Sequence, residues 1–402
     1  MNICENSILM AILGDCMGIP YEFPKKMISI ESPDDYLTAS KKRIGGRYFP
    51  TIIDCEIGEY SDDTQMMLMT LRSLQYDDFV EAMKAELVAF MAYEQGSGRA
   101  TRKACKLLEK NKYAWEDSDY YNAGGNGVAM RVLPHAFQDD NIVQIMTYVF
   151  LNGILTHGSP VALVSSQLYV YYIWCLLHNK VFDIEAQKNI WANQHKNLIN
   201  EHELISEFYS NAPSDYDNEW NKTVDSLISV YKNVNRNLDT IISDIPVCGS
   251  EKGAGTWCVI TSILLSELSI ENPIQLLKTV ATLKDADTDT LACILGGILG
   301  VKYNTPSELI LKIKDINYIK SEIESFKTYK HCISFDFVTK KNLKDKLRAL
   351  PIGGSLYVSP FGVVTLAEVQ TLESLSDSVS SYLYKFNTQL GQSISTLQFK
   401  RV

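Results

Sequence analysis

The chain has 402 residues, of which 46% are hydrophobic and 21% are charged, and its formal net charge is −10. This length is enough to bury a full hydrophobic core in one large domain or two. Because no basic stripe offsets the negative charge, we expect no general nucleic-acid binding, and an anionic substrate would need local metal ions, helix N-termini or placed cations.

The cysteines and the apolar runs predict a cytoplasmic protein without a membrane span. The nine cysteines lie singly, and an odd count in a chain of this size fits a reducing compartment better than a secreted protein. The first five residues lack the basic side chains of a signal peptide. Residues 161–177 are apolar enough for a span, yet they include Ser165, Ser166 and Gln167, so we predict a buried core helix.

Helical periodicity dominates the first three quarters of the chain. Residues 77–94 place apolar side chains on one face, and Asp78 with Glu81 predicts a capping box at the start of this helix. A proline after asparagine at residues 272–273 predicts the start of another helix. Residues 305–308 repeat the capping-box pattern.

We divide the chain into a helical domain, residues 1–328, and a small C-terminal module, residues 329–402. The helical domain contains a polar insert at about 178–246, where residues 191–246 are rich in asparagine and predict one or two surface helices joined by long loops. The module is predicted to be α+β, with β-rich runs at 331–338 and 354–366, helices at 340–350 and 367–386, and a closing strand at 396–402. No catalytic constellation falls in the module.

Two acid-rich segments each stand directly before an apolar helix. The first is Ser61-Asp62-Asp63, and the second is Asp287-Thr288-Asp289-Thr290. Each alone is most simply a helix N-terminus whose acids complement the helix dipole. Together they offer four carboxylates and no nitrogen or sulfur ligand, which suits two Mg²⁺ or Mn²⁺ ions better than zinc. The EF-hand pattern for calcium fails, because its glycine and its last glutamate are missing.

Three further segments carry candidate groups. Residues 14–18 contain two glycines and lead to Glu22 through a proline. Residues 124–131 form a glycine-rich loop, which presents backbone N–H groups to phosphate if it runs into a helix, although the Walker A ending is missing. His157 follows Thr156 between two predicted helices, and a lone histidine in such a place is more often structural than catalytic.

In this order the segments resemble the ADP-ribosylglycohydrolase family, which includes dinitrogenase-reductase-activating glycohydrolases and ADP-ribosylarginine hydrolases. The resemblance covers roughly residues 5–305. The matching motifs are GD-x-x-G…E at Gly14, Asp15, Gly18 and Glu22, TDDT at Ser61-Asp62-Asp63-Thr64 with serine first, GNG-x-AMR at residues 125–131, a Thr-His pair at Thr156-His157, and GGDTDT at Asp287-Thr288-Asp289-Thr290.

The resemblance implies an all-α fold, a compact orthogonal helical domain around a dimetal centre. It implies two Mg²⁺ ions, or Mn²⁺, with the ligands Ser61, Asp62, Asp63, Asp287, Asp289 and Thr290. Glu22, as a mobile acid at the metals, would be catalytic together with Asp62 and Asp63. The residues implied to hold ADP-ribose are Gly124, Gly125, Asn126, Gly127, Val128, Met130 and His157. Arg131 would be structural and paired with a buried acid.

The resemblance implies Mg²⁺-dependent removal of ADP-ribose from a modified protein or other acceptor, by cleavage of the glycosidic bond at the distal ribose. Two departures weaken the transfer of arginine specificity: Asp285-Ala286 replaces two glycines, and Ser97 stands where arginine-cleaving members often carry an aspartate. One alternative is a non-enzymatic ADP-ribose-binding or immunity protein that covers an ADP-ribosyltransferase toxin. Another is a Mg²⁺ phosphohydrolase that cleaves the diphosphate.

Overall fold

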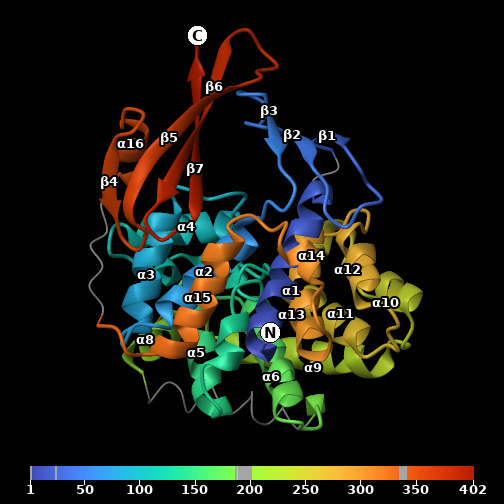
Figure 1. Cartoon of the computed structure of the whole chain (residues 1–402). Helices are drawn as coiled ribbons and strands as arrows, with labels where there is room; N and C mark the ends of the chain where they lie inside the picture. Colours follow the sequence, from blue (N-terminus) through green and yellow to red (C-terminus); the bar gives the residue numbers. More distant parts are fainter. Residues whose placement is uncertain (1, 23–24, 186–187, 189–201, 335–341) are drawn as a thin grey trace.

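The computed structural model describes the whole chain except residues 1, 23–24, 186–187, 189–201 and 335–341. The described part is a stack of helices with two small antiparallel sheets at one end (Figure 1). Its α-helices are α1 Ile3–Gly18, α2 Asp62–Ser73, α3 Phe79–Phe90, α4 Arg99–Leu108, α5 Ile142–Ile154, α6 Pro160–Leu177, α8 Glu203–Asn211, α9 Tyr216–Asn233, α10 Leu238–Asp244, α11 Gly255–Ser266, α12 Pro273–Ala281, α13 Thr288–Lys302, α14 Ser307–Ile310, α15 Ile316–Tyr329 and α16 Leu343–Arg348.

Short 3-10 helices and two sheets complete the described structure. The 3-10 helices are η1 Ile19–Tyr21, η2 Ala114–Glu116, η3 Ser118–Asn122, η4 Leu133–Phe137 and η5 Gly249–Glu251. The N-terminal sheet has the order β1-β2-β3, with strands Met27–Ile30, Ser40–Ile44 and Thr51–Cys55. The C-terminal sheet has the order β4-β5-β6-β7, with strands Ser355–Val358, Gly362–Leu372, Val379–Thr388 and Ser393–Arg401.

Helices α1 and α13 pack against each other in the core, and glycines let their backbones touch. A methyl group added at Gly14 would lie 2.2 Å from the carbonyl oxygen of Ala292. One added at Gly18 would lie 2.4 Å from the Cα of Asp289. The glycines of the first motif therefore bring the end of α1 directly against the start of α13.

Gly18→Ala should separate these two helix ends. Because the added methyl would meet backbone atoms that cannot rotate away, we expect the free energy of unfolding to fall by about 1–3 kcal/mol. Gly98→Ala is the matched control, since a methyl group there would meet nothing within 4 Å. Thermal melting of the two variants measures the difference, and equal melting temperatures would contradict the close approach of α1 and α13.

Two helical segments are long and apolar enough to cross a membrane, and the protein interior covers both. α6 matches the helix predicted over 161–177, and 78% of its most apolar window is buried. The segment Ile3–Tyr21, which includes α1, is 89% buried. Burial in the core accounts for the apolar character of both segments.

Two of the predicted helix starts are confirmed. The side chain of Asp78 caps α3 by accepting the N–H of Glu81 at 3.0 Å. The side chain of Asn272 caps α12, which has Pro273 in its first turn. Both caps depend on residues within one turn of each other, which is why the sequence shows them.

The capping box predicted at residues 305–308 is wrong. The N–H and the hydroxyl of Thr305 both donate to Oδ1 of Asn6 at 2.8 Å, and α14 has no side-chain cap. A distant partner thus replaces the local one.

The described part of the polar insert contains three helices, α8, α9 and α10, where one or two were predicted. Residues 189–201 of that insert lie outside the described residues.

The fold is helix-rich but not all-α, and the helix predicted over 367–386 is wrong. β5 and β6 occupy this stretch, with pairs running from Val364↔Thr388 to Leu372↔Ser381. Strand pairing across the sheet overrides the local helix propensity of these residues. The closing strand is confirmed by β7, the run at 354–366 by β4 and β5, and the charged helix by α16. Part of the run at 331–338 lies outside the described residues.

The N-terminal sheet was not predicted. Its central strand β2 reads Ser-Lys-Lys-Arg-Ile and pairs with both neighbours, so it lacks the apolar alternation that marks a half-buried strand. The division of the chain at residue 328 stays a prediction.

Candidate active site

Asp15 on α1 fixes the start of α2. Its buried carboxylate accepts the N–H groups of Ser61 and Thr64, each at 3.1 Å, and the hydroxyl of Thr64 at 2.6 Å. Ser61 caps the helix in turn, because its hydroxyl oxygen accepts the N–H of Asp63 at 3.1 Å. A carboxylate that receives the free N–H groups of a helix is a strong anchor. It holds Asp62 and Asp63 in the first turn of α2.

Helix α13 brings the second acidic segment to the end of α1. Asp287 is its N-cap residue, and Asp289 lies in its first turn. The hydroxyl of Thr288 donates to the carbonyl of Gly18 at 2.9 Å, which ties this turn to α1. Glu22 follows shortly after α1, and one carboxylate oxygen each from Glu22, Asp287 and Asp289 lie within 4.8 Å of one another.

The acids of the two segments act on one another electrostatically. Burial raises the pKa of Asp62 and of Asp63 well above the usual range, and the charge of Asp289 is the next cause in both. Burial and then the charge of Asp287 raise the pKa of Asp289 to about 8. Burial and then Asp289 raise the pKa of Glu22. The structure therefore brings both segments and Glu22 together, while their roles stay a prediction.

This set of side chains suits a hard divalent cation. Oδ2 of Asp63 is buried without a hydrogen-bond partner in the described structure, and such an oxygen is costly to bury unless a cation compensates it. Ser61 and Thr290 add buried hydroxyl groups beside the carboxylates. Crowded oxygen ligands are typical of Mg²⁺ and Mn²⁺ sites. The cluster therefore fits the predicted kind of cofactor, and the number and identity of the ions belong to the proposal below.

The metal-free protein should lose stability as the pH rises from 5 to 8. The folded pKa of Asp289, about 8, lies above the unfolded value of about 3.9. The stability from this proton is fully present below the unfolded pKa and is lost as the pH rises through the folded one, by up to about 1.4 kcal/mol per pH unit for one carboxyl. Mg²⁺ should restore stability at pH 8 and matter less at pH 5, where protons compete with it.

Melting temperatures with Mg²⁺ or with EDTA, across this pH range, measure the effect. Asp289→Asn is the control, because it removes one of the titrating groups and should make the metal-free profile less steep. A wild-type melting temperature that is independent of pH and of Mg²⁺ would contradict the crowding of these acids.

The glycine-rich loop lies beside the acids but does not run into a helix, which corrects the prediction. From Asn126 to Arg131 the chain makes successive turns, and the next helical element is the short η4. The N–H of Asn126 donates to the carbonyl of Gly253 at 2.8 Å. The N–H groups of Gly127 and Val128 donate to no residue that the structure describes. These two N–H groups are therefore the loop's candidates for holding an anionic ligand, without the help of a helix dipole, with Gly127 partly buried and Val128 buried.

Several residues predicted to hold ADP-ribose have side chains that pack in the core or bind another protein residue. Those of Val128 and Met130 are buried in the hydrophobic core, so these two side chains do not face a ligand. Nδ2 of Asn126 donates to Oδ2 of Asp287 at 2.8 Å, which lowers the pKa of that carboxyl against the effect of burial. Asn126 thus orients a predicted metal ligand. Sequence reasoning missed this contact because the two residues are 161 positions apart.

Arg131 is fully buried but pairs with no acid in the described structure, which corrects the prediction. Its guanidinium donates to Oδ1 of Asn152 at 2.8 Å, to the carbonyl of Gly127 at 2.9 Å and to Oγ1 of Thr156 at 2.8 Å. This Arg131 network joins the glycine-rich loop to the Thr-His pair, because Gly127 belongs to the loop and Thr156 to the pair.

The same network orients His157. Oγ1 of Thr156 lies 2.8 Å from Nδ1 of His157, and burial lowers the pKa of His157 to about 3, so the ring is neutral. Since Arg131 can only donate to Thr156, we assign the hydroxyl proton to Nδ1 and the ring proton to Nε2. A methyl group added at Gly127 would lie 3.3 Å from this Nε2. His157 therefore presents an N–H donor beside the glycine-rich loop.

The loop Glu94–Gly98 lies against Asp62. The N–H of Asp62 donates to the carbonyl of Gln95 at 3.1 Å. A methyl group on Gly96, whose φ is +106°, would lie 3.2 Å from Oδ1 of Asp62. The hydroxyl of Ser97 is buried and donates to the carboxylate of Glu94. Ser97 is thus bound within its own loop, and sequence reasoning missed Gln95 and Gly96 because neither carries a reactive side chain.

Asp285 lies outside the buried group of acids. Its side chain is exposed and forms no ion pair with a residue that the structure describes. Its φ is +61°, in the left-handed region that glycine adopts freely and aspartate tolerates. This backbone conformation explains why a glycine suits the same position in the motif that the segment resembles.

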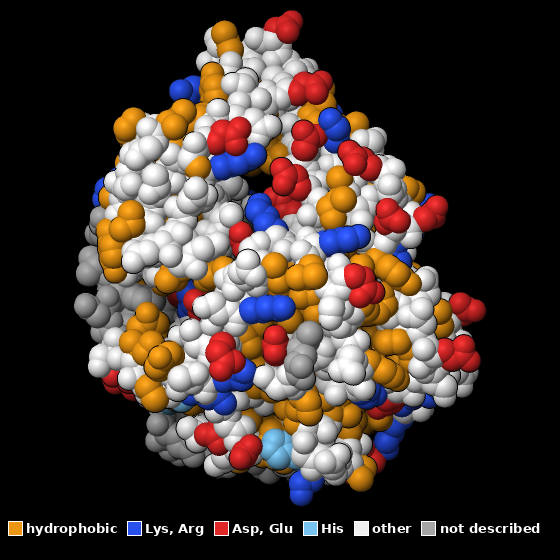
Figure 2. Space-filling view, in the orientation of Figure 1, with side chains coloured by type: hydrophobic (Ala, Val, Ile, Leu, Met, Phe, Trp, Pro, Cys, Tyr) orange, Lys and Arg blue, Asp and Glu red, His pale blue; other side chains and the backbone are white. Residues whose placement is uncertain are grey.

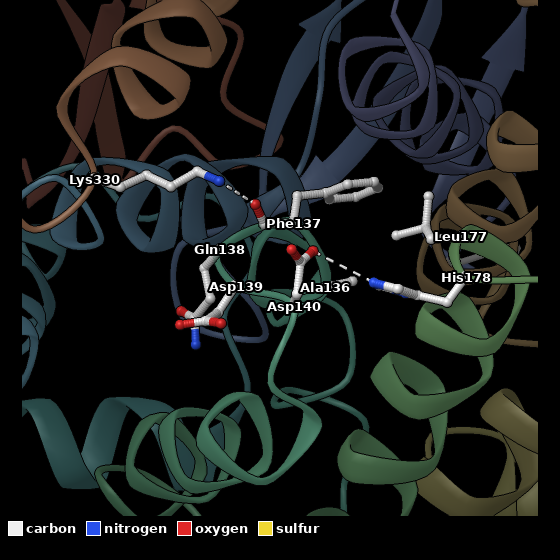
Figure 3. A pocket seen from close by; sticks show the side chains of 8 residues that line it. All are labelled: Ala136, Phe137, Gln138, Asp139, Asp140, Leu177, His178 and Lys330. Carbon is white, nitrogen blue, oxygen red and sulfur yellow. Dashed lines mark hydrogen bonds and ion pairs between the residues drawn. The ribbon is translucent and has the colours of Figure 1, made fainter.

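A polar hollow on the surface lies between η4 and the end of α6 and shares no residue with the acids. Figure 3 shows His178 reaching toward Asp140, with 3.4 Å between Nε2 and Oδ1, while Nζ of Lys330 donates to the carbonyl of Phe137. Among the described residues, the group of three or more potential metal ligands is Glu22 with Asp287 and Asp289. We therefore take the buried acids as the candidate active site.

Known proteins share this sequence pattern and this fold. The family model described as ADP-ribosylglycohydrolase matches residues 5–330. ADP-ribosylhydrolase ARH3 from Xenopus tropicalis is 27% identical over 165 residues, which cover 39% of this chain and 45% of that protein. A solved structure titled ADP-ribosylglycohydrolase-related protein complex has a TM-score of 0.53 and 14% identity, with 82% of this chain and 98% of the other covered. At that identity the likeness shows the fold alone.

Proposed function

Because this chain belongs to the ADP-ribosylglycohydrolase family, we propose that it is a hydrolase that removes ADP-ribose from a modified protein or another acceptor by cleaving the glycosidic bond at the distal ribose. The observation that carries the proposal is the meeting of Glu22 with Asp287 and Asp289, of which Asp289 is buried and the other two partly buried, beside the N–H groups of the glycine-rich loop that have no protein partner among the described residues. We place the protein in the cytoplasm, a proposal that its nine free cysteines support.

Two Mg²⁺ ions, or Mn²⁺, are the proposed cofactors. The residues that would hold them are Ser61, Asp62, Asp63, Asp287, Asp289 and Thr290. Such ions, when bound, supply a water of lowered pKa and orient the hydroxyl groups of the ribose. Asn126 and the Asp15 anchor keep the carboxylates in place from outside the site.

Residues of the chain itself would transfer the proton, compensate charge and bind the substrate. Glu22 is partly buried and its pKa is raised, so it can accept the proton of the attacking water as a general base. The four carboxylates would offset the charge of the two proposed ions, so that the positive charge of an oxocarbenium-like transition state is not repelled from the site. The N–H groups of Gly127 and Val128 and Nε2–H of His157 would hold oxygens of the ADP-ribose.

The test is release of free ADP-ribose from a panel of proteins and peptides with differently linked ADP-ribose. We expect release in Mg²⁺ buffer, loss with EDTA and recovery when Mg²⁺ is restored, with free ADP-ribose identified by mass. AMP and ribose phosphate as products would show a phosphohydrolase instead. Tight binding of ADP-ribose or of an ADP-ribosyltransferase toxin without any release would show the non-enzymatic alternative. The acceptor of the best substrate would settle the linkage, which Ser97 and Asp285 leave open.

A further inference from the structure

The two sheets are joined to each other at their outer ends. The N–H of Ile52 in β3 donates to the carbonyl of Glu373 at 2.9 Å, and the N–H of Leu375 donates to the carbonyl of Pro50 at 2.9 Å. The segment 373–375 after β5 is therefore an antiparallel partner of β3. The hydroxyl oxygens of Thr51 and Ser381 lie 2.6 Å apart in the same junction, and both side chains are fully buried.

Aromatic packing adds to this junction. The rings of Phe49 and Phe399 are stacked, with 5.6 Å between their centroids. A buried hydroxyl pair, two backbone hydrogen bonds and a stacked ring pair make a contact that does not open without cost. We name the N-terminal sheet, the segment 373–375 and the C-terminal sheet together the frame.

Both sheets of the frame are connected to the acidic site at their inner ends. On one side, β1 begins five positions after Glu22, and the charge of Lys42 in β2 lowers the pKa of both Glu22 and Asp289. On the other side, Nε2 of Gln95 donates to Oγ of Ser395 in β7 at 3.3 Å. The carbonyl of the same Gln95 accepts the N–H of Asp62.

The frame and the acidic site therefore form a closed ring. Figure 1 shows the two sheets rising from the helices on either side and meeting above them. Figure 2 shows an opening in the surface between them, with acidic and basic side chains around it. The glycine-rich loop contacts the acids through the hydrogen bond from Asn126 to Asp287. If the diphosphate lies on that loop, the acceptor on the distal ribose projects toward the frame.

We propose that the frame stays closed during turnover and that the acceptor reaches the acids as an extended, flexible segment or a small conjugate, not as the rigid face of a folded protein. This inference rests on the proposed function. It assigns to the C-terminal sheet a role in selecting acceptors. A side chain on a rigid surface cannot bring its ADP-ribose through a closed ring, because the surrounding surface meets the frame first.

The first test compares one ADP-ribosylated sequence as a free peptide and as a helix within a folded domain. We expect kcat/KM of the wild-type protein to be about tenfold or more higher for the free peptide, because the folded substrate must first open locally. Equal values for the two substrates would overturn the inference. Absence of release from both, and from every other conjugate, would instead count against the proposed function, so the two failures are distinguishable.

The second test locks the frame. In Thr51→Cys/Ser381→Cys the two sulfurs replace hydroxyl oxygens 2.6 Å apart, and the oxidised protein is checked for the cross-link by mass. The cross-linked protein should cleave the free peptide within about twofold of the singly substituted Thr51→Cys control, a difference below 0.5 kcal/mol as expected of a substitution that leaves the site intact. Loss of that activity on oxidation and its return on reduction would overturn the closed frame.

The third test opens the frame without a new covalent bond. Thr51→Val/Phe399→Ala removes the hydroxyl contact and the stacked ring, whereas Thr51→Ser/Phe399→Tyr keeps both kinds of contact. We expect the first variant to reduce the preference for the free peptide about threefold or more by raising kcat/KM on the folded substrate, since weaker contacts make opening more frequent. An unchanged preference in a folded variant would overturn the inference.

Discussion

Asp62→Asn and Asp289→Asn should each abolish turnover and leave the fold intact. Each replaces one buried carboxylate of the candidate active site by a neutral amide of nearly the same shape. Loss of a metal ligand removes several kcal/mol of transition-state stabilisation, so kcat should fall by about three orders of magnitude or more. Turnover of an ADP-ribosyl conjugate in excess Mg²⁺ measures this effect.

The fold should survive because the substitutions relieve repulsion. In the wild-type protein, the charge of Asp289 raises the pKa of both Asp62 and Asp63. Removing one charge from this group costs nothing electrostatically when no metal is bound. The metal-free variants should therefore melt no lower than the metal-free wild type.

Asp285→Asn is the matched control for both variants. Asp285 is exposed, and its left-handed backbone conformation is one that asparagine also tolerates. We expect kcat within about twofold of the wild type, as for a surface substitution. Near wild-type turnover by Asp62→Asn or Asp289→Asn in magnesium buffer would show that the dimetal assignment is wrong.

The sequence showed the acids because each acidic segment is a local pattern at a helix start. Ser61 and Asp287 are N-cap residues in the structure, and capping depends on neighbours within one turn. The glycines of the first motif belong to the same site, since Gly18 lets the end of α1 approach Asp289. Local patterns therefore predicted which residues meet, though not how they are held.

The supporting contacts could not be predicted, because they join distant parts of the chain. Asp15 is bonded to Thr64, 49 positions away, and nothing in its own segment distinguishes an anchor from a ligand. The helix predicted over 367–386 was wrong for the same reason. Residues around Ala367 favour a helix locally, and only pairing between β5 and β6 makes them a hairpin. The frame depends on both sheets, one of which was not predicted and the other only in part.

Arg72→Met should lower the free energy of unfolding by about 3–5 kcal/mol, because it leaves a buried carboxylate without its partner. Nε and Nη2 of Arg72 donate to the two carboxylate oxygens of Glu86 at 2.6 and 2.8 Å. The two side chains are 4% and 0% exposed. Nη1 donates to the hydroxyl of Tyr318 at 2.5 Å and to Oε1 of Gln392 at 3.1 Å. One guanidinium thus joins α2 and α3 to α15 and to the C-terminal sheet.

The loss should depend on pH in a defined direction. Burial raises the pKa of Glu86, and Arg72 opposes that effect, so the pKa should rise further when Arg72 is removed. A folded pKa above the unfolded one gives stability that is present at low pH and lost as the pH rises through the folded value. Urea unfolding should therefore show a smaller deficit for Arg72→Met at pH 5 than at pH 8.

A double variant separates charge from packing. Arg72→Met/Glu86→Leu removes both charges and should recover most of the lost stability, because a buried ion pair replaced by apolar side chains is often neutral or stabilising. Lys41→Met is the surface control: its pair with Asp54 has side chains 49% and 59% exposed, and its loss should not be measurable. The guanidinium of Arg72 also lies over the ring of Phe361, 5.1 Å from its centroid. If the single and double variants were equally unstable at both pH values, the loss of this packing, and not the charge of Glu86, would explain the effect.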